Sequence, residues 1–197
     1  MLDIEQGTQL VEIARDVVEN YLQKEKTDLK KFEEGFLKEK KGVFVTIETW
    51  PEKKLRGCIG FPQPTHALGE AVQSAALSAA FEDPRFPPMQ KDELKKIVFE
   101  ISVLTVPELV AVKNSSEYCK KIKIGKDGLI MQNGSHAGLL LPQVATEYNW
   151  SAEEFLDNLA RKAGLTPDFV HEKNTKIWKF QVQIFAEKKP CGEVEVK

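Results

Sequence analysis

The chain has 197 residues, of which 42% are hydrophobic and 29% charged, and its formal net charge is −2. This length and composition suffice for a buried core, in one large domain or in two small interlocked ones, and they exclude a disordered chain. The nearly balanced charge also excludes a global electrostatic attraction to nucleic acid or to acidic lipid.

The cysteines are Cys58, Cys119 and Cys191, and they form no CxxC pair. An odd number of widely spaced cysteines argues against a disulfide framework and against a zinc site. The sequence contains neither the apolar segment of a signal peptide nor a run long enough to cross a membrane. We therefore expect a cytoplasmic protein with no metal, no cofactor and no membrane contact.

The first part of the chain predicts a helix, a hairpin and a second helix. Apolar residues recur at helical spacing from about Gly7 to Lys24, and a short helix is expected around Lys30–Lys38. Val43–Ile47 and Leu55–Phe61 are short and β-rich and flank a turn with a proline, so they predict a β-hairpin. Thr65 is expected to cap an alanine-rich helix that packs closely against a sheet.

The middle of the chain predicts a loop, a strand and a second hairpin. Three prolines make Glu82–Pro88 a stiff, ordered loop, and Val98–Val106 follows as a strand. Asn114 with Glu117 resembles a capping box for a short helix that reaches about Lys121. Asn133-Gly134 is the expected two-residue turn of a hairpin between Gly128–Gln132 and Gly138–Leu141.

The last part of the chain predicts a capped helix and a final strand. Ser151 and Glu154 form a capping box, and Gly164 stands where a glycine ends a helix. Apolar and polar residues alternate over Trp178–Ile184, as in a half-buried strand. Antiparallel-looking strands separated by helices of varied length favour an α+β fold.

The segment Leu55–Gly60 is the first candidate for chemistry. Alternate strand residues share a face, so Arg56, Cys58 and Gly60 are expected to point the same way. A guanidinium roughly 6.5–7 Å along the strand from Cys58 can favour the thiolate. Gly57 and Gly60 indicate a bulge or the close approach of another backbone. Two interpretations stay open: a reactive cysteine in an electropositive niche, or a small buried hydrophobic residue.

Two further segments carry candidate residues. Asp83 and Arg85 either bind a ligand from a stiff loop or pair with each other to pin that loop. Glu100 and Ser102 share one strand face, where they either meet solvent or line a cleft beside Arg56.

A nucleophilic cysteine normally has a histidine as its base. Neither His66 nor His136 has a recognisable spacing to Cys58, so both are expected to be surface residues.

Four sequence blocks occur in an order that resembles the signature blocks of the AMMECR-type domain family, in its archaeal or bacterial branch. They are Leu55–Gly60, Asp83–Phe86, Glu100–Leu104 and Gly138–Val144, and the similarity extends from about Val43 to Ala186. The resemblance implies one domain over residues 1–197, made of two unequal interlocked subdomains. It also implies association with Memo-type and radical-SAM proteins (the AmmeMemoRadiSam system), but it supplies no reaction.

Three classes of function follow. The preferred one is an enzyme or enzyme-accessory domain for a small anionic substrate, either monomeric or homodimeric, in which Cys58 is thiolate or redox group, Arg56 an anion clamp and Glu100 an acid or base. Surface lysine clusters suggest RNA binding instead, although the acidic balance counts against it. The third class is a non-catalytic interaction domain in which Cys58 is structural. Block residues expected to contact substrate are Gly57, Gly60, Asp83, Arg85 and Ser102.

Overall fold

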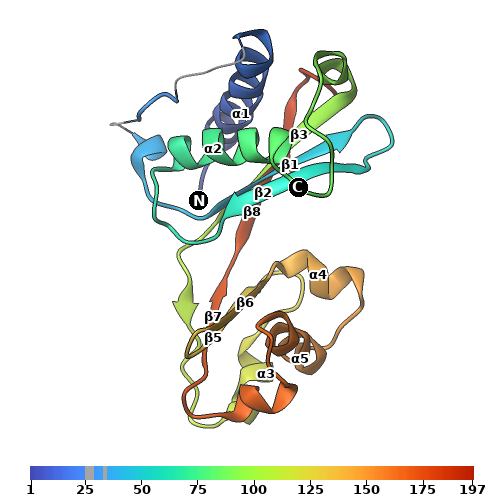
Figure 1. The fold of residues 1–197 in the computed structure, drawn as a ribbon. Coiled ribbons are helices and arrows are strands. Elements are labelled where there is room, and N and C mark those ends of the chain that lie inside the picture. The colour runs from blue at the N-terminus through green and yellow to red at the C-terminus, as the bar shows by residue number, and fades with distance from the viewer. Residues whose placement is uncertain (25–28, 33–34) are drawn as a thin grey trace. The chain divides into compact units, whose positions relative to one another are not determined.

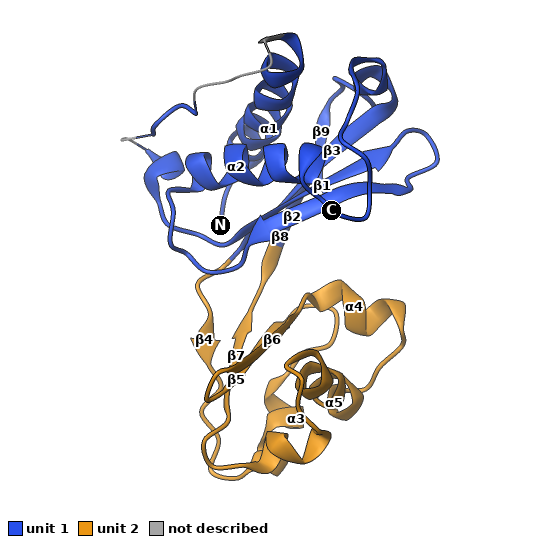
Figure 2. Cartoon of the chain, in the orientation of Figure 1, with its two compact units in different colours: residues 1–104, 183–197 blue, residues 105–182 orange. Residues whose placement is uncertain are grey.

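The computed structural model describes residues 1–24, 29–32 and 35–197, which form two compact units (Figure 2). Unit 1 comprises Met1–Leu104 and Gln183–Lys197, and unit 2 comprises Thr105–Val182. Helices combine with one five-stranded and one four-stranded antiparallel sheet, which confirms the α+β class. Among the described residues, no helix has the length and apolarity that a membrane crossing requires.

Unit 1 is built on the sheet of order β2-β1-β3-β8-β9, with α1 and α2 packed on one face (Figure 1). Alternate residues of β1, namely Val43, Val45 and Ile47, are fully buried in the same core as residues of both helices. The other face therefore carries the intervening side chains. The elements are α1 (Ile4–Lys24), η1 (Phe36–Lys38), β1 (Val43–Thr49), β2 (Leu55–Phe61), α2 (Leu68–Phe81), η2 (Lys91–Lys96), β3 (Ile97–Leu104), β8 (Val182–Glu187) and β9 (Val194–Val196).

The alanine-rich face of α2 packs directly on the sheet, as predicted. Ala75, Ala76 and Ala79 are at most 1% exposed. A Cβ atom on Gly57 of β2 would lie only 2.1 Å from the carbonyl oxygen of Ala79. The helix backbone thus rests on a strand position that only glycine leaves open.

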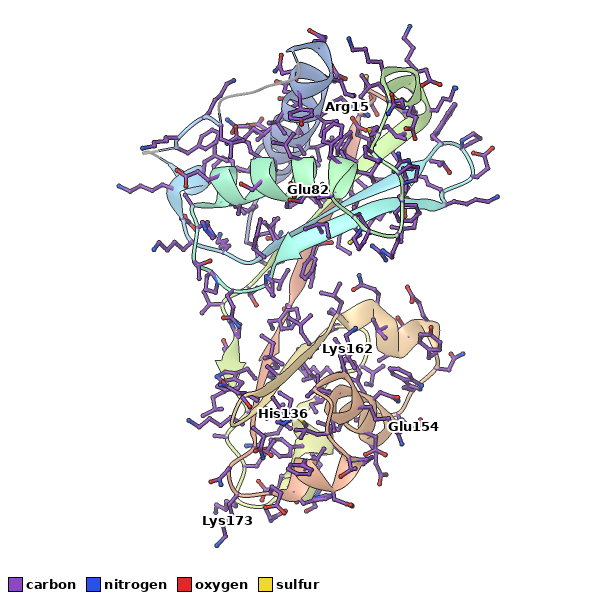
Figure 3. The ribbon with its side chains drawn as sticks, in the orientation of Figure 1. Arg15, Glu82, His136, Glu154, Lys162 and Lys173 are labelled. Atoms are coloured by element: carbon purple, nitrogen blue, oxygen red, sulfur yellow. The ribbon has the colours of Figure 1, made fainter. Side chains whose placement is uncertain are left out.

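A buried ion pair joins α1 to β8. Arg15 of α1, labelled in Figure 3, donates from Nε to Glu187 at 2.7 Å, and the two residues are 7% and 3% exposed. The guanidinium also donates to the carbonyl oxygens of Leu94 and Ile97 and lies over the Phe99 ring, 4.9 Å from its centroid. Glu187 accepts the Phe99 backbone N–H at 3.0 Å. Both charges are therefore compensated by several partners, as buried charges must be.

Unit 2 packs short helices on the sheet of order β4-β7-β5-β6. Its core joins Phe155 and Leu159 of α5 to Leu129, Met131 and Ile177 of the sheet. The elements are β4 (Glu108–Leu109), η3 (Ser115–Glu117), α3 (Tyr118–Lys121), β5 (Gly128–Asn133), β6 (His136–Leu140), α4 (Pro142–Glu147), α5 (Ala152–Lys162), η4 (Pro167–His171) and β7 (Lys176–Phe180).

Helix α5 has the two ends that its sequence predicts. The Ser151 side chain accepts the N–H of Glu154 at 3.2 Å, and the Glu154 carboxylate accepts the N–H of Ser151 at 2.8 Å. Gly164, at φ +76°, follows the helix in the left-handed conformation.

The predicted strand Trp178–Ile184 is wrong as one element, because β7 ends at Phe180 and β8 begins at Val182 in the other sheet. Between them, the Gln181 N–H bonds to the Thr105 hydroxyl at 2.9 Å. The alternation of apolar and polar residues continues through this change of sheet, so the pattern conceals it.

Two helix starts differ from expectation. Helix α2 begins at Leu68 after Ala67, and the Thr65 hydroxyl contacts His66 Nδ1 instead of capping the helix. The Asn114 side chain bonds to the Glu117 carboxylate at 3.2 Å but to no backbone N–H, so the predicted capping box there is incomplete.

Two shorter predictions also need correction. Of the helix expected around Lys30–Lys38, only the 3₁₀ turn Phe36–Lys38 forms; residues 29–32 are not helical, and 33–34 lie outside the described residues. The second hairpin closes with Asn133 opposite His136, so its two-residue loop is Gly134–Ser135, one position later than predicted.

Candidate functional site

Cys58, Thr46 and Glu100 stand side by side across β2, β1 and β3. Thr46 is the ladder partner of Cys58 on one side and of Glu100 on the other. Directly paired residues share a sheet face, and this face is opposite the one that α1 and α2 cover. The Thr46 hydroxyl lies 3.3 Å from the Cys58 sulfur and donates to it. A thiol, a hydroxyl and a carboxylate thus form one row.

The thiol in this row is held in its neutral form. Burial raises the pKa of Cys58, and the Thr46 hydrogen bond and the Arg85 charge offset that effect only in part. The environment therefore does the opposite of what an activating guanidinium would do.

A second row lies next to the first and contains Gly60, Phe44 and Ser102. A Cβ atom on Gly60 would lie 2.3 Å from the Phe44 ring, so the ring covers the glycine. Ser102 is buried beside it. The two strand blocks identified in the sequence are therefore brought together through β1, which supplies the intervening residue of each row.

Arg56 does not lie over the sulfur, which corrects the expected arrangement. The ladder pairs Ile47 with Gly57 and Glu48 with Leu55, so Arg56 is the extra residue of a β-bulge. Its guanidinium donates to Glu93 at 2.6 and 3.0 Å and to the Pro87 carbonyl oxygen at 2.9 Å. The two hydrogen bonds from Arg56 to Glu93 lower the pKa of the Glu93 carboxyl.

One nitrogen of Arg56 is left without a partner. Its Nη1 atom is buried and makes no hydrogen bond within the described part of the chain. The Phe86 ring lies within cation–π range of both neighbouring guanidiniums, at 5.9 Å from Arg56 and 5.5 Å from Arg85. A buried donor without an acceptor is costly, and a bound water or anion is its usual complement.

Asp83 and Arg85 pair with each other and form hydrogen bonds with the backbone of Cys58. The Asp83 carboxylate accepts the Arg85 Nη2 group at 2.6 Å and the Cys58 N–H at 2.9 Å, while Arg85 donates to the Cys58 carbonyl oxygen at 3.3 Å. The hydrogen bonds from Arg85 hold the pKa of Asp83 well below its usual range. Asp83 is buried, and its contacts agree with the interpretation in which the pair pins the loop. Arg85 takes part in the same pair, but 53% of its side chain is exposed.

We expect Asp83→Asn to remove a stabilising contribution that depends on pH. Because the folded-state pKa of Asp83 is depressed, its contribution is fully present above the unfolded value of about 3.9 and is lost as pH falls through the folded value. Urea unfolding of both proteins between neutral pH and about pH 3 checks this. The stability gap between them should narrow as the pH falls through the range below about 4. A gap that stays constant would contradict the assignment.

The remaining candidates lie apart from the thiol or have other partners. Glu100 is paired with Lys197 rather than with Arg56. His66 contacts Thr65 and the Phe61 ring, and His136 contacts the carbonyl oxygen of Ala163. In the part of the chain that the structure describes, no group of three or more acidic, cysteine or histidine side chains could hold a metal ion.

Sequence reasoning missed two residues of this site. Thr46 bonds to the sulfur, and Glu93 holds Arg56. The alternation within Val43–Ile47 places Thr46 on the outer face, but its pairing with Cys58 depends on the register. Glu93 carries a local signal only as part of a capping box with Gln90.

The fold and these sequence blocks define a class of protein. It is an α+β protein of two units in which a paired aspartate and arginine, Asp83 and Arg85, bind the backbone of the strand residue Cys58. The chain belongs to the AMMECR1 family, whose model matches residues 11–185. It is 51% identical over 194 residues to Protein MJ0810 of Methanocaldococcus jannaschii, covering 98% of this chain and 96% of that one. Protein MK0488 of Methanopyrus kandleri is 46% identical, with 98% and 94% covered. The crystal structure of an uncharacterized protein of Pyrococcus horikoshii, PH0010, superposes with a TM-score of 0.88 at 45% identity, covering 100% and 98%.

Proposed function

We propose that this chain is a cytoplasmic enzyme or enzyme-accessory domain that binds a small anionic substrate at the Arg56–Cys58 segment. The observation that carries the proposal is the buried Arg56 Nη1, which has no acceptor among the described residues. The half-exposed guanidinium of Arg85 lies within cation–π range of the same Phe86 ring as Arg56. Guanidinium groups suit carboxylate and phosphate, which would supply the missing acceptor.

The row beside this segment supplies groups for proton transfer. Cys58 is a neutral thiol in the resting protein, bonded by Thr46. Glu100, on the other side of Thr46, is the carboxylate in this row that would accept the thiol proton, relayed through the Thr46 hydroxyl, once its pairing with Lys197 opens. The proposed partners are Memo-type and radical-SAM proteins, which the resemblance to this family implies. The two units would act together as one domain.

The alkylation rate of Cys58 as a function of pH is the measurement that tests the site. With Cys119 and Cys191 replaced by serine, we expect iodoacetamide to react slowly at neutral pH and half-maximally above about 8.5, because burial raises the thiol pKa. Inorganic phosphate or succinate, bound at Arg85 and Arg56, should slow the reaction in a saturable way.

Two variants sharpen this experiment. Arg85→Ala should abolish the effect of the added anion, whereas Arg161→Ala, which removes an exposed arginine of unit 2, should preserve it. An alkylation rate that neither anion changes would sink the anion site. A thiol titrating well below about 8.5 would contradict the neutral resting state.

A non-catalytic interaction domain is the second candidate, and one observation favours it. Asp83 and Arg85 use their hydrogen bonds to pair with each other and to hold the Cys58 backbone, which is a structural task. In that case Cys58→Ala would cost only stability, on the order of 1–3 kcal/mol, and leave partner capture unchanged.

A further inference from the structure

A hollow lies in unit 1 where the β1–β2 turn meets the β8–β9 loop, and no residue of the Cys58 row lines it. Trp50, Lys188, Lys189 and Glu193 line a hollow of about 480 Å³ there. That volume falls within the range of small-molecule sites, roughly 300–1,000 Å³. Trp50 is 41% exposed, so a large part of its indole is available to a ligand.

The backbone on both sides of the hollow is fixed by hydrogen bonds. The Trp50 N–H donates to the Lys96 carbonyl oxygen at 2.8 Å, which anchors the start of the β1–β2 turn. The Lys188 N–H donates to the Glu193 carbonyl oxygen at 2.9 Å, which closes the base of the β8–β9 loop. The indole and the lysines therefore project from anchored positions, which lowers the entropic cost of binding.

The two lysines differ in their partners. Lys188 Nζ is 3.0 Å from the Glu193 carboxylate, which occupies that pair. Lys189 makes no salt bridge with any described residue, although its charge contributes, after that of Lys188, to lowering the pKa of the Glu193 carboxyl. Its aliphatic stem instead folds across Gly192, where a Cβ atom would lie 2.5 Å from Lys189 Cγ. The hollow thus holds one aromatic surface and, with two lysines against one carboxylate, a net positive charge.

This combination selects a class of ligand. An indole face offers stacking to a flat aromatic ring, and the Lys189 ammonium, which stands outside the Lys188–Glu193 salt bridge, offers a contact to a phosphate. The net positive charge of the lining groups disfavours a cationic ring, and an aliphatic anion would make no use of the indole. We infer that this hollow binds a nucleotide, with the base stacked on Trp50 and the phosphate at Lys189. The nucleotide is either a free mononucleotide or one residue of a single strand.

Binding of adenosine monophosphate, adenosine and a ten-residue oligoadenylate to the full chain, measured at low salt by calorimetry, tests the inference. Stacking of a base contributes enough that Trp50→Ala should weaken binding by about 5- to 150-fold. Trp50→Phe keeps a ring and should retain most of the affinity. Lys189→Gln should weaken binding of the phosphorylated probes and leave adenosine unaffected. Lys126→Gln, at an exposed lysine in unit 2, is the matched control.

The outcomes distinguish a free nucleotide from a nucleotide within a single strand. Binding of the monophosphate comparable to that of the oligomer supports a free nucleotide, and binding of the oligomer alone supports a single-stranded nucleic acid. No binding of either probe overturns the inference, and so does binding that Trp50→Ala or Lys189→Gln leaves unchanged. Thermal unfolding of each variant confirms that it is folded. Cys58 alkylation should be the same in all of them, so this site can fail while the anion site stands.

Discussion

Replacing Glu187 with alanine is expected to lower the free energy of unfolding by about 3–5 kcal/mol, because it leaves the buried Arg15 guanidinium without its counterion. The Phe99 N–H loses its acceptor in the same variant. Urea unfolding at neutral pH, followed by circular dichroism, measures the change.

A double variant distinguishes the energetic contribution of the ion pair from the cost of leaving one charge unpaired. Arg15→Met combined with Glu187→Leu removes both charges and fills similar volume, so it should be considerably more stable than Glu187→Ala alone. Glu19→Ala, which removes only the weaker partner of Arg15 at 3.4 Å, should change stability by less than about 1 kcal/mol. If Glu187→Ala cost no more than Glu19→Ala, the ion pair would not stabilise the joint between α1 and β8.

The second large effect is expected from Gly57→Ala. The new methyl group would lie 2.1 Å from the Ala79 carbonyl oxygen, and because that atom belongs to the backbone, helix or strand must move. Overpacking of a core typically costs about 1–3 kcal/mol, and we expect this variant at or above the upper end. Chemical denaturation measures it, and Cys58 alkylation at fixed pH should accelerate if β2 separates from α2.

Gly134→Ala is the matched control for that variant. Gly134 has φ +59°, and a methyl group added there would meet no described atom within 4 Å, so its substitution carries only the backbone strain of the left-handed conformation. That strain costs about 1–2 kcal/mol. An equal loss in the two variants would mean that the contact between β2 and α2 relaxes without cost.

Local signals predicted the parts of the fold that depend on neighbouring residues. Ser151, Glu154 and Gly164 define α5 because capping needs groups only three residues apart or a single residue's conformation. The alternation over Trp178–Ile184 was just as clear, but strand periodicity carries no information about which sheet a strand joins. The change at Gln181 therefore could not be predicted.

The candidate site shows the same division. Alternation along β2 placed Cys58 on one face, yet the bulge at Arg56 turns its guanidinium toward Glu93, which is 37 positions away in the chain. Thr46 reaches the sulfur through the hairpin register, and Asp83 reaches the Cys58 N–H through the path of a loop. These contacts depend on tertiary geometry, so the residue types were predictable and their partners were not.

The hydrogen bonds of Asp83 and Arg85 with the Cys58 backbone have a consequence for the protein's behaviour at high concentration. β2 is the outermost strand on its side of the sheet, so its unpaired N–H and C=O groups could template a strand from another molecule. At Cys58 both groups are already occupied, by a carboxylate and a guanidinium. The Asp83–Arg85 pair therefore hinders intermolecular strand pairing at Cys58, and its loss would favour aggregation through the edge of β2.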